Sequence, residues 1–188
     1  MTSELRRHVH ILFYLCDVME KICFHARMGF YNSPKLSLAN DIMHYLCFLI
    51  AADNKVTWEE TAIVNEILDE SNLKQVANSQ ELAEIVRDFV NDPFMQKIPE
   101  SLKLFISFDL NAKAEKQFGN INYSVSELYV GVLRALGEEM IACDGQVDKS
   151  ERETLQAYIS RLISYTNNEL KKDENNQNGG TVFIGGKA

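Results

Sequence analysis

One stretch of the chain occurs twice, first as Ile50-Ala51-Ala52-Asp53-Asn54-Lys55-Val56-Thr57-Trp58-Glu59-Glu60 and again as Ile141-Ala142-Cys143-Asp144-Gly145-Gln146-Val147-Asp148-Lys149-Ser150-Glu151. Aligned without a gap, the two copies share the isoleucine, the first alanine, the aspartate, the valine and the final glutamate. Each shared position has a plausible role in backbone geometry, so the likeness indicates a repeated structural unit rather than an accident.

Each copy predicts an elbow between two helices. An apolar helical run ends at Asp-Asn or Asp-Gly, and Asn and Gly tolerate the left-handed backbone that closes a helix. The next helix is then capped by Thr57 or Asp148, and the glutamate three residues later can reach back to the cap N–H in a capping box. Val56 and Val147 precede the caps, and we expect each to tuck under its elbow as part of a hydrophobic staple.

Helical periodicity dominates the rest of the chain. Apolar residues recur at helical spacing, and no stretch alternates as a β-strand would until the last eight residues. A chain of 188 residues with 46% hydrophobic content can bury one substantial core. We therefore expect an all-α fold, a single bundle of about seven helices with two quasi-repeated helix–elbow–helix units.

The predicted bundle covers residues 1–168, and its last helix begins at Asp148 and ends near Asn168. Residues 169–188 are expected to form a flexible polar tether that ends in a short apolar peptide. That peptide contains Val182, Phe183 and Ile184, which are candidates for partner binding by strand addition or side-chain anchoring, in cis or in trans. An inert tail is the alternative.

The charge balance narrows the range of partners. The chain has 27 acidic and 19 basic residues and a net charge of −8. Binding to nucleic acid needs clustered Lys and Arg, so this composition argues against a nucleic-acid surface. A metal ion or a basic protein suits the charge better.

The cysteines and the apolar runs indicate a cytoplasmic location. None of the four cysteines has Cys-x-x-Cys spacing, and all lie in apolar helical patterns, as reduced and buried thiols do. They are Cys16, Cys23, Cys47 and Cys143. The longest early apolar run, Ile11 to Cys16, is too short to span a bilayer, so we expect neither a signal peptide nor direct insertion into a membrane.

The doubled pattern is close to Ala-x-Asp-Gly-x-Val-x-x-x-Glu, and it resembles the TerB family of tellurite-resistance and stress-response domains over roughly residues 36–165. The resemblance implies a compact, non-enzymatic helical bundle that works in stress, phage-defence or membrane-linked complexes. It also implies divalent-cation binding by acidic residues. The positions carried over are Asp53, Glu60, Asp144 and Glu151, although the first copy departs from the pattern at Asn54.

A fifth acid is a metal candidate from the helical pattern alone. Extending the apolar stripe of residues 128–136 by one turn reaches Glu139, which therefore points towards the interior; Glu138 is its neighbour. The cation would be Ca²⁺, Mg²⁺ or Mn²⁺, held weakly. The pattern argues against an EF-hand, because its first and third ligand positions would fall on Met140 and Ala142, which carry no side-chain oxygen. Capping and turn hydrogen bonds alone also explain the four elbow acids, so both interpretations remain open.

The sequence therefore favours an interaction or scaffold module in a bacterial stress-response, tellurite-resistance or phage-defence complex, with protein partners. Trp58, on the first turn after the elbow, is either a half-exposed partner anchor or a staple for the elbow. Two alternatives are a metal-dependent enzyme for phosphoester chemistry and an acidic immunity protein that masks a basic partner. An inward cluster of four or more acids would favour the enzyme, and acids dispersed over capping positions would favour the module.

Overall fold

The computed structural model describes residues 2–25, 34–53, 55–90, 97–115, 124–145, 147 and 149–178. These residues form the helices α1 (Ser3–His25), α2 (Pro34–Ile50), α3 (Trp58–Glu70), α4 (Ser79–Val90), α5 (Glu100–Glu115), α6 (Val125–Met140) and α7 (Lys149–Asn178). No strand occurs in the described ranges, and the predicted all-α helical bundle is confirmed. Val182, Phe183 and Ile184 lie outside the described residues.

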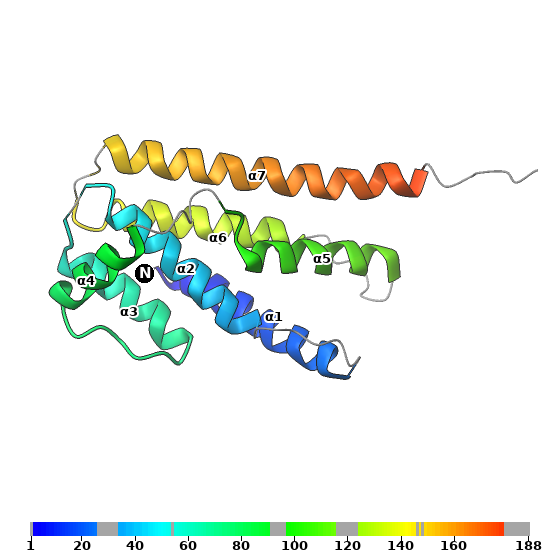
Figure 1. Cartoon of the computed structure of the whole chain (residues 1–188). Coiled ribbons are helices and arrows are strands. Elements are labelled where there is room, and N and C mark those ends of the chain that lie inside the picture. Colours follow the sequence, from blue (N-terminus) through cyan, green and yellow to red (C-terminus); the bar gives the residue numbers. More distant parts are fainter. Residues whose placement is uncertain are drawn as a thin grey trace, which may run out of the picture.

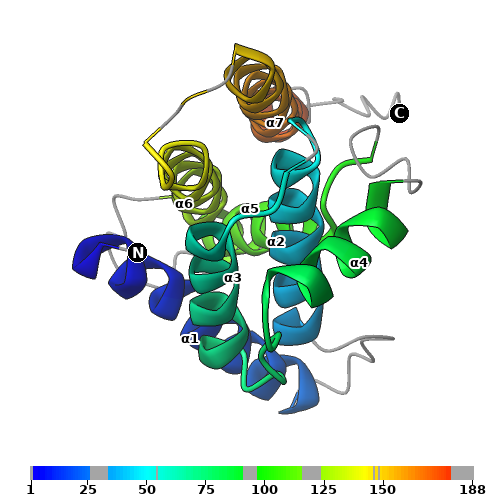
Figure 2. The same cartoon turned by 90° about the vertical axis from the view of Figure 1, so that its left-hand side faces the viewer.

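Helix α2 is the centre of the bundle, because it packs against each of the other six helices. Apolar side chains occur around most of its circumference, which is the pattern of a largely buried helix, although Leu36 and Asn40 are exposed. Figure 2 shows α3 and α4 flanking α2 in that view, and Figure 1 shows α7 as a long rod beside α6 and α5. Within the described ranges, no helix is both long enough and apolar enough to cross a bilayer.

Two buried aspartates cap helices other than their own. Asp41 of α2 is 6% exposed and accepts hydrogen bonds from the backbone N–H and the hydroxyl of Ser101, at 2.8 and 2.6 Å, on the first turn of α5. The Ser101 hydroxyl also lies 2.9 Å from the hydroxyl of Tyr129. Burial raises the pKa of Asp41, and the Ser101 hydrogen bonds oppose this shift.

The second of these aspartates, Asp109 of α5, caps the start of α6. Its carboxylate accepts hydrogen bonds from the backbone N–H groups of Val125 and Ser126, at 2.8 and 2.9 Å. It also accepts hydrogen bonds from the hydroxyls of Ser124 and Ser126, at 2.7 and 2.6 Å. The free N–H groups at a helix start favour a carboxylate, so each aspartate fixes where the helix that it caps begins.

A glycine brings α6 close to α2 and α7. The Tyr45 hydroxyl donates to the Leu133 carbonyl of α6 at 2.9 Å, and its ring stacks on that of Tyr158 with centroids 5.1 Å apart. A Cβ on Gly137 would fall on the Tyr45 hydroxyl and against Leu155. The absence of a side chain at Gly137 is therefore a packing requirement.

Helix α7 continues ten residues beyond Asn168, where we expected it to end. No Gly or Pro interrupts residues 169–178, and Lys172 pairs with Glu169 at 2.6 Å, an i,i+3 ion pair that supports a helix. The first half of the predicted tether is therefore helical. The polar composition that we took for a flexible spacer belongs to the C-terminal part of a long helix.

Two glycines of α6 offer a matched test of this packing. Gly137→Ala should destabilise the protein by about 1–3 kcal/mol, because the added methyl group overpacks the contact with Tyr45. Gly131→Ala should instead stabilise it by up to about 1 kcal/mol, because a Cβ there meets nothing within 4 Å and alanine favours the helix. Urea unfolding of both variants measures the difference, and equal effects would contradict the close approach at Gly137.

Candidate functional site

The two elbows lie together at one end of the bundle (Figures 1 and 2). The hydroxyl of Ser150, in the second elbow, donates to the carbonyl of Ala52, in the first, at 3.3 Å. Glu60 and Glu151 are also close enough that the charge of Glu151 raises the pKa of Glu60. The fold therefore joins two segments that are far apart in the sequence. We call the described residues within 50–60 and 141–151 together the elbow surface.

The described parts of the two elbows have corresponding local geometry. The backbone N–H of Ala52 donates to the carbonyl three residues earlier, at 3.0 Å, and the aligned Cys143 does the same at 3.3 Å. The following helices begin at Trp58 and Lys149, which are aligned positions. This correspondence is local, and the wider quasi-repeat of the two halves stays a prediction.

Gly145 has the left-handed backbone that we expected at the second elbow, with φ of +80°. Its N–H donates to the carbonyl of Ala142 at 3.1 Å. A residue with a Cβ is strained in this conformation, so glycine is the suitable residue here. The aligned Asn54 lies outside the described residues.

The capping box of the first elbow is confirmed. The Thr57 hydroxyl oxygen accepts from the Glu60 N–H at 3.2 Å, and the Glu60 carboxylate accepts from the Thr57 N–H at 2.7 Å. The Thr57 carbonyl accepts hydrogen bonds from the hydroxyls of Thr61 and Ser79, at 2.8 and 3.1 Å. The bond from Ser79 connects the elbow to the start of α4. The Asp53 side chain accepts from the backbone N–H two residues later at 2.8 Å, so its predicted turn bond is also present.

The second elbow differs from our expectation at Val147. This side chain is 41% exposed and borders a groove between α6 and α7, so the prediction that it tucks under the elbow is wrong. Val56, at the aligned position, does pack against the core while partly exposed.

Asp148 lies outside the described residues, so its capping box with Glu151 stays a prediction.

Negative charge is concentrated where the elbows meet. Glu60 is 6% exposed; burial raises its pKa, the hydrogen bonds from Thr57 oppose this, and the charges of Asp53 and Glu151 raise it further. Burial also raises the pKa of the Cys143 thiol, to about 11, together with the charges of Glu60, Asp144 and Glu59. The thiol is therefore protonated at neutral pH and a poor nucleophile.

The five predicted metal ligands do not form one ligand set. Glu60 and Glu151 are buried, Asp53 and Glu139 are partly exposed, and Asp144 is exposed. In the part of the chain that the structure describes, no group of three His, Cys, Asp or Glu side chains is arranged to hold a metal ion. The acids are dispersed over capping and surface positions rather than clustered inwards.

Trp58 is more exposed than we expected. Its side chain is 72% exposed on the first turn of α3, beside Glu59 of the elbow surface. At this exposure the indole does little to close the elbow. Among the described cysteines, Cys16 and Cys47 are buried, as predicted, and Cys143 is partly buried.

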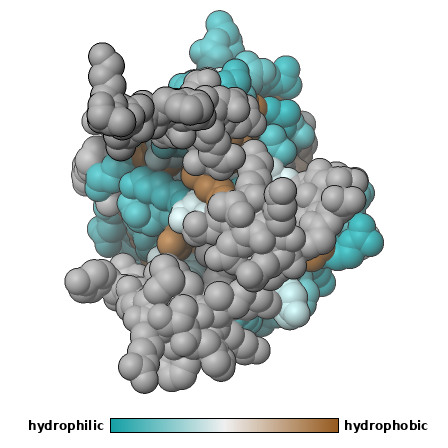
Figure 3. All heavy atoms as spheres, turned by 90° about the vertical axis from the view of Figure 1, so that its right-hand side faces the viewer, coloured by the Kyte–Doolittle hydropathy of each residue, from teal (hydrophilic) through white to brown (hydrophobic). Residues whose placement is uncertain are grey.

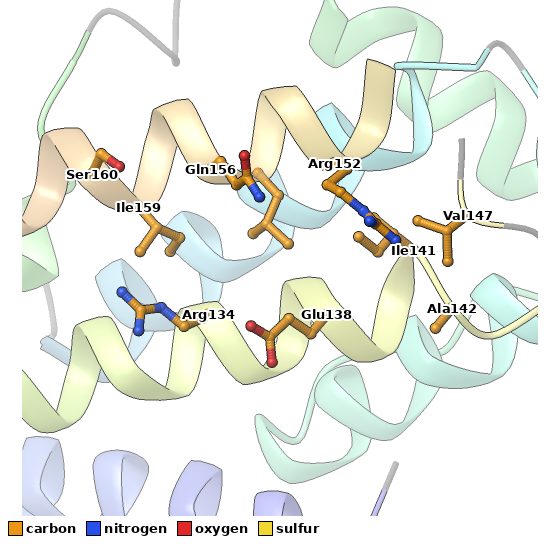
Figure 4. A pocket seen from close by; sticks show the side chains of 10 residues that line it. Arg134, Glu138, Ile141, Ala142, Val147, Arg152, Gln156, Ile159 and Ser160 are labelled. Atoms are coloured by element: carbon orange, nitrogen blue, oxygen red, sulfur yellow. The ribbon is translucent and has the colours of Figure 1, made fainter. Parts of the chain in front are cut away.

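The groove between α6 and α7 is a feature that the sequence analysis missed. It has a volume of about 540 Å³ and an apolar floor that includes Leu155 and Ile159. Figure 4 shows Arg134 and Glu138 on α6 and Arg152 on α7 at its sides. Isolated charges on the exposed faces of two helices give no sequence signal until the packing of those helices is known.

A comparison with protein-family models, curated proteins and solved structures found no match. The TerB-type interpretation consequently rests on the residues of the two elbows.

The proximity of Glu60 and Glu151 can be tested by titration. Glu151→Gln should lower the pKa of Glu60, because it removes a neighbouring negative charge, but burial should keep that pKa above its ordinary value of 4.5. Carboxyl ¹³C NMR over a pH series measures the pKa directly. Glu153→Gln, at an exposed position on the same helix, is the control and should leave the pKa of Glu60 unchanged.

Proposed function

We propose that this chain is a non-enzymatic, TerB-type interaction module. It works in the cytoplasm within a bacterial stress-response, tellurite-resistance or phage-defence complex. Its elbow surface contacts a protein partner and holds a divalent cation weakly. The proposal combines the resemblance at the two elbows with one structural observation. The elbows lie side by side, with the buried carboxylates of Glu60 and Glu151 close to each other.

The buried pair Glu60 and Glu151 carries the proposal. Two carboxylates that are both buried and close to each other repel, and burial removes the water that would screen them. A cation or a positively charged partner group placed beside them would relieve this repulsion. Because few carboxylates are available, the ion affinity should be weak, with a dissociation constant of about 10⁻⁴–10⁻³ M for Ca²⁺.

Trp58 supports partner binding at the same surface. Tryptophan is enriched among the residues that dominate protein interfaces, and an exposed one offers a large apolar area at a low entropic cost. The acids of the same elbow surface, Asp53, Glu59 and Asp144, would complement a basic partner segment. The expected partner surface is therefore basic, with a recess for the indole.

The distribution of the acids supports the module more than the enzyme. The Glu60 carboxylate accepts a hydrogen bond in the capping box, and the Asp53 carboxylate accepts one in the turn. Asp144 faces solvent, so the acids do not converge on one reaction centre. Carboxylate-held metal catalysis needs several ligands around one open position.

Cation binding should appear in calorimetric titrations of the intact protein with Ca²⁺, Mg²⁺ and Mn²⁺. The double variant Asp144→Asn/Glu151→Gln should bind at least tenfold more weakly, because it removes two charges and keeps hydrogen-bonding groups. Its control is Glu84→Gln/Asp88→Asn, which removes the same charge from exposed positions on α4. The absence of ion-dependent heat in the wild type, or equal loss in the control, would reject the cation site.

Partner binding should depend on the indole. In the native host, proximity labelling with the full chain should lose specific protein neighbours when Trp58 is replaced by Ala, because truncation removes the proposed anchor. Tyr14→Ala is the matched control, since Tyr14 is a similarly exposed aromatic residue on α1. Identical sets of neighbours for the wild type and Trp58→Ala would reject this role even if a cation binds.

A further inference from the structure

We draw no further inference here: the strongest candidate, the open groove of about 540 Å³ between α6 and α7 with Arg134, Glu138 and Arg152 at its sides, carries nothing because nothing in the structure shows what covers it, and the described residues at the end of the molecule opposite the elbows, which are mostly hydrophilic (Figure 3), give no stronger one.

Discussion

The central position of α2 is the constraint on which the rest of the structure depends. A helix that packs against all six others buries most of its side chains, so each buried polar atom on it needs a partner inside the bundle. Asp41 accepts a hydrogen bond from the start of α5, and the Tyr45 hydroxyl donates one to a carbonyl of α6. These bonds fix both the position and the axial register of the neighbouring helices.

The packing of α2 at the centre of the bundle also brings the two elbows together. Because α2 and α6 both pack in the core, the turns that leave their C-terminal ends emerge side by side, and Ser150 reaches the carbonyl of Ala52. Glu60 and Glu151, each on the first turn of the next helix, consequently share one poorly solvated region. Their repulsion is a consequence of the packing, and it makes this region attractive to positive charge.

Features that depend on neighbouring residues in the sequence were predictable, and those that depend on distant packing were not. The Thr57–Glu60 box and the left-handed Gly145 follow from local backbone chemistry, and both are present. The capping of α5 by Asp41 needs a partner sixty residues away, which no local pattern reveals. Val147 matched a staple motif, but whether a surface covers it is decided by how α6 and α7 pack.

The stacking of Tyr45 on Tyr158 has a consequence for biosynthesis. Tyr45 leaves the ribosome long before Tyr158, so a nascent chain carries α2 with one flank uncovered until the last helix is made. Domains generally fold as units during synthesis, and exposed apolar surface in incomplete chains invites aggregation. Shortened translation products of this protein should therefore be clients of chaperones rather than folded fragments.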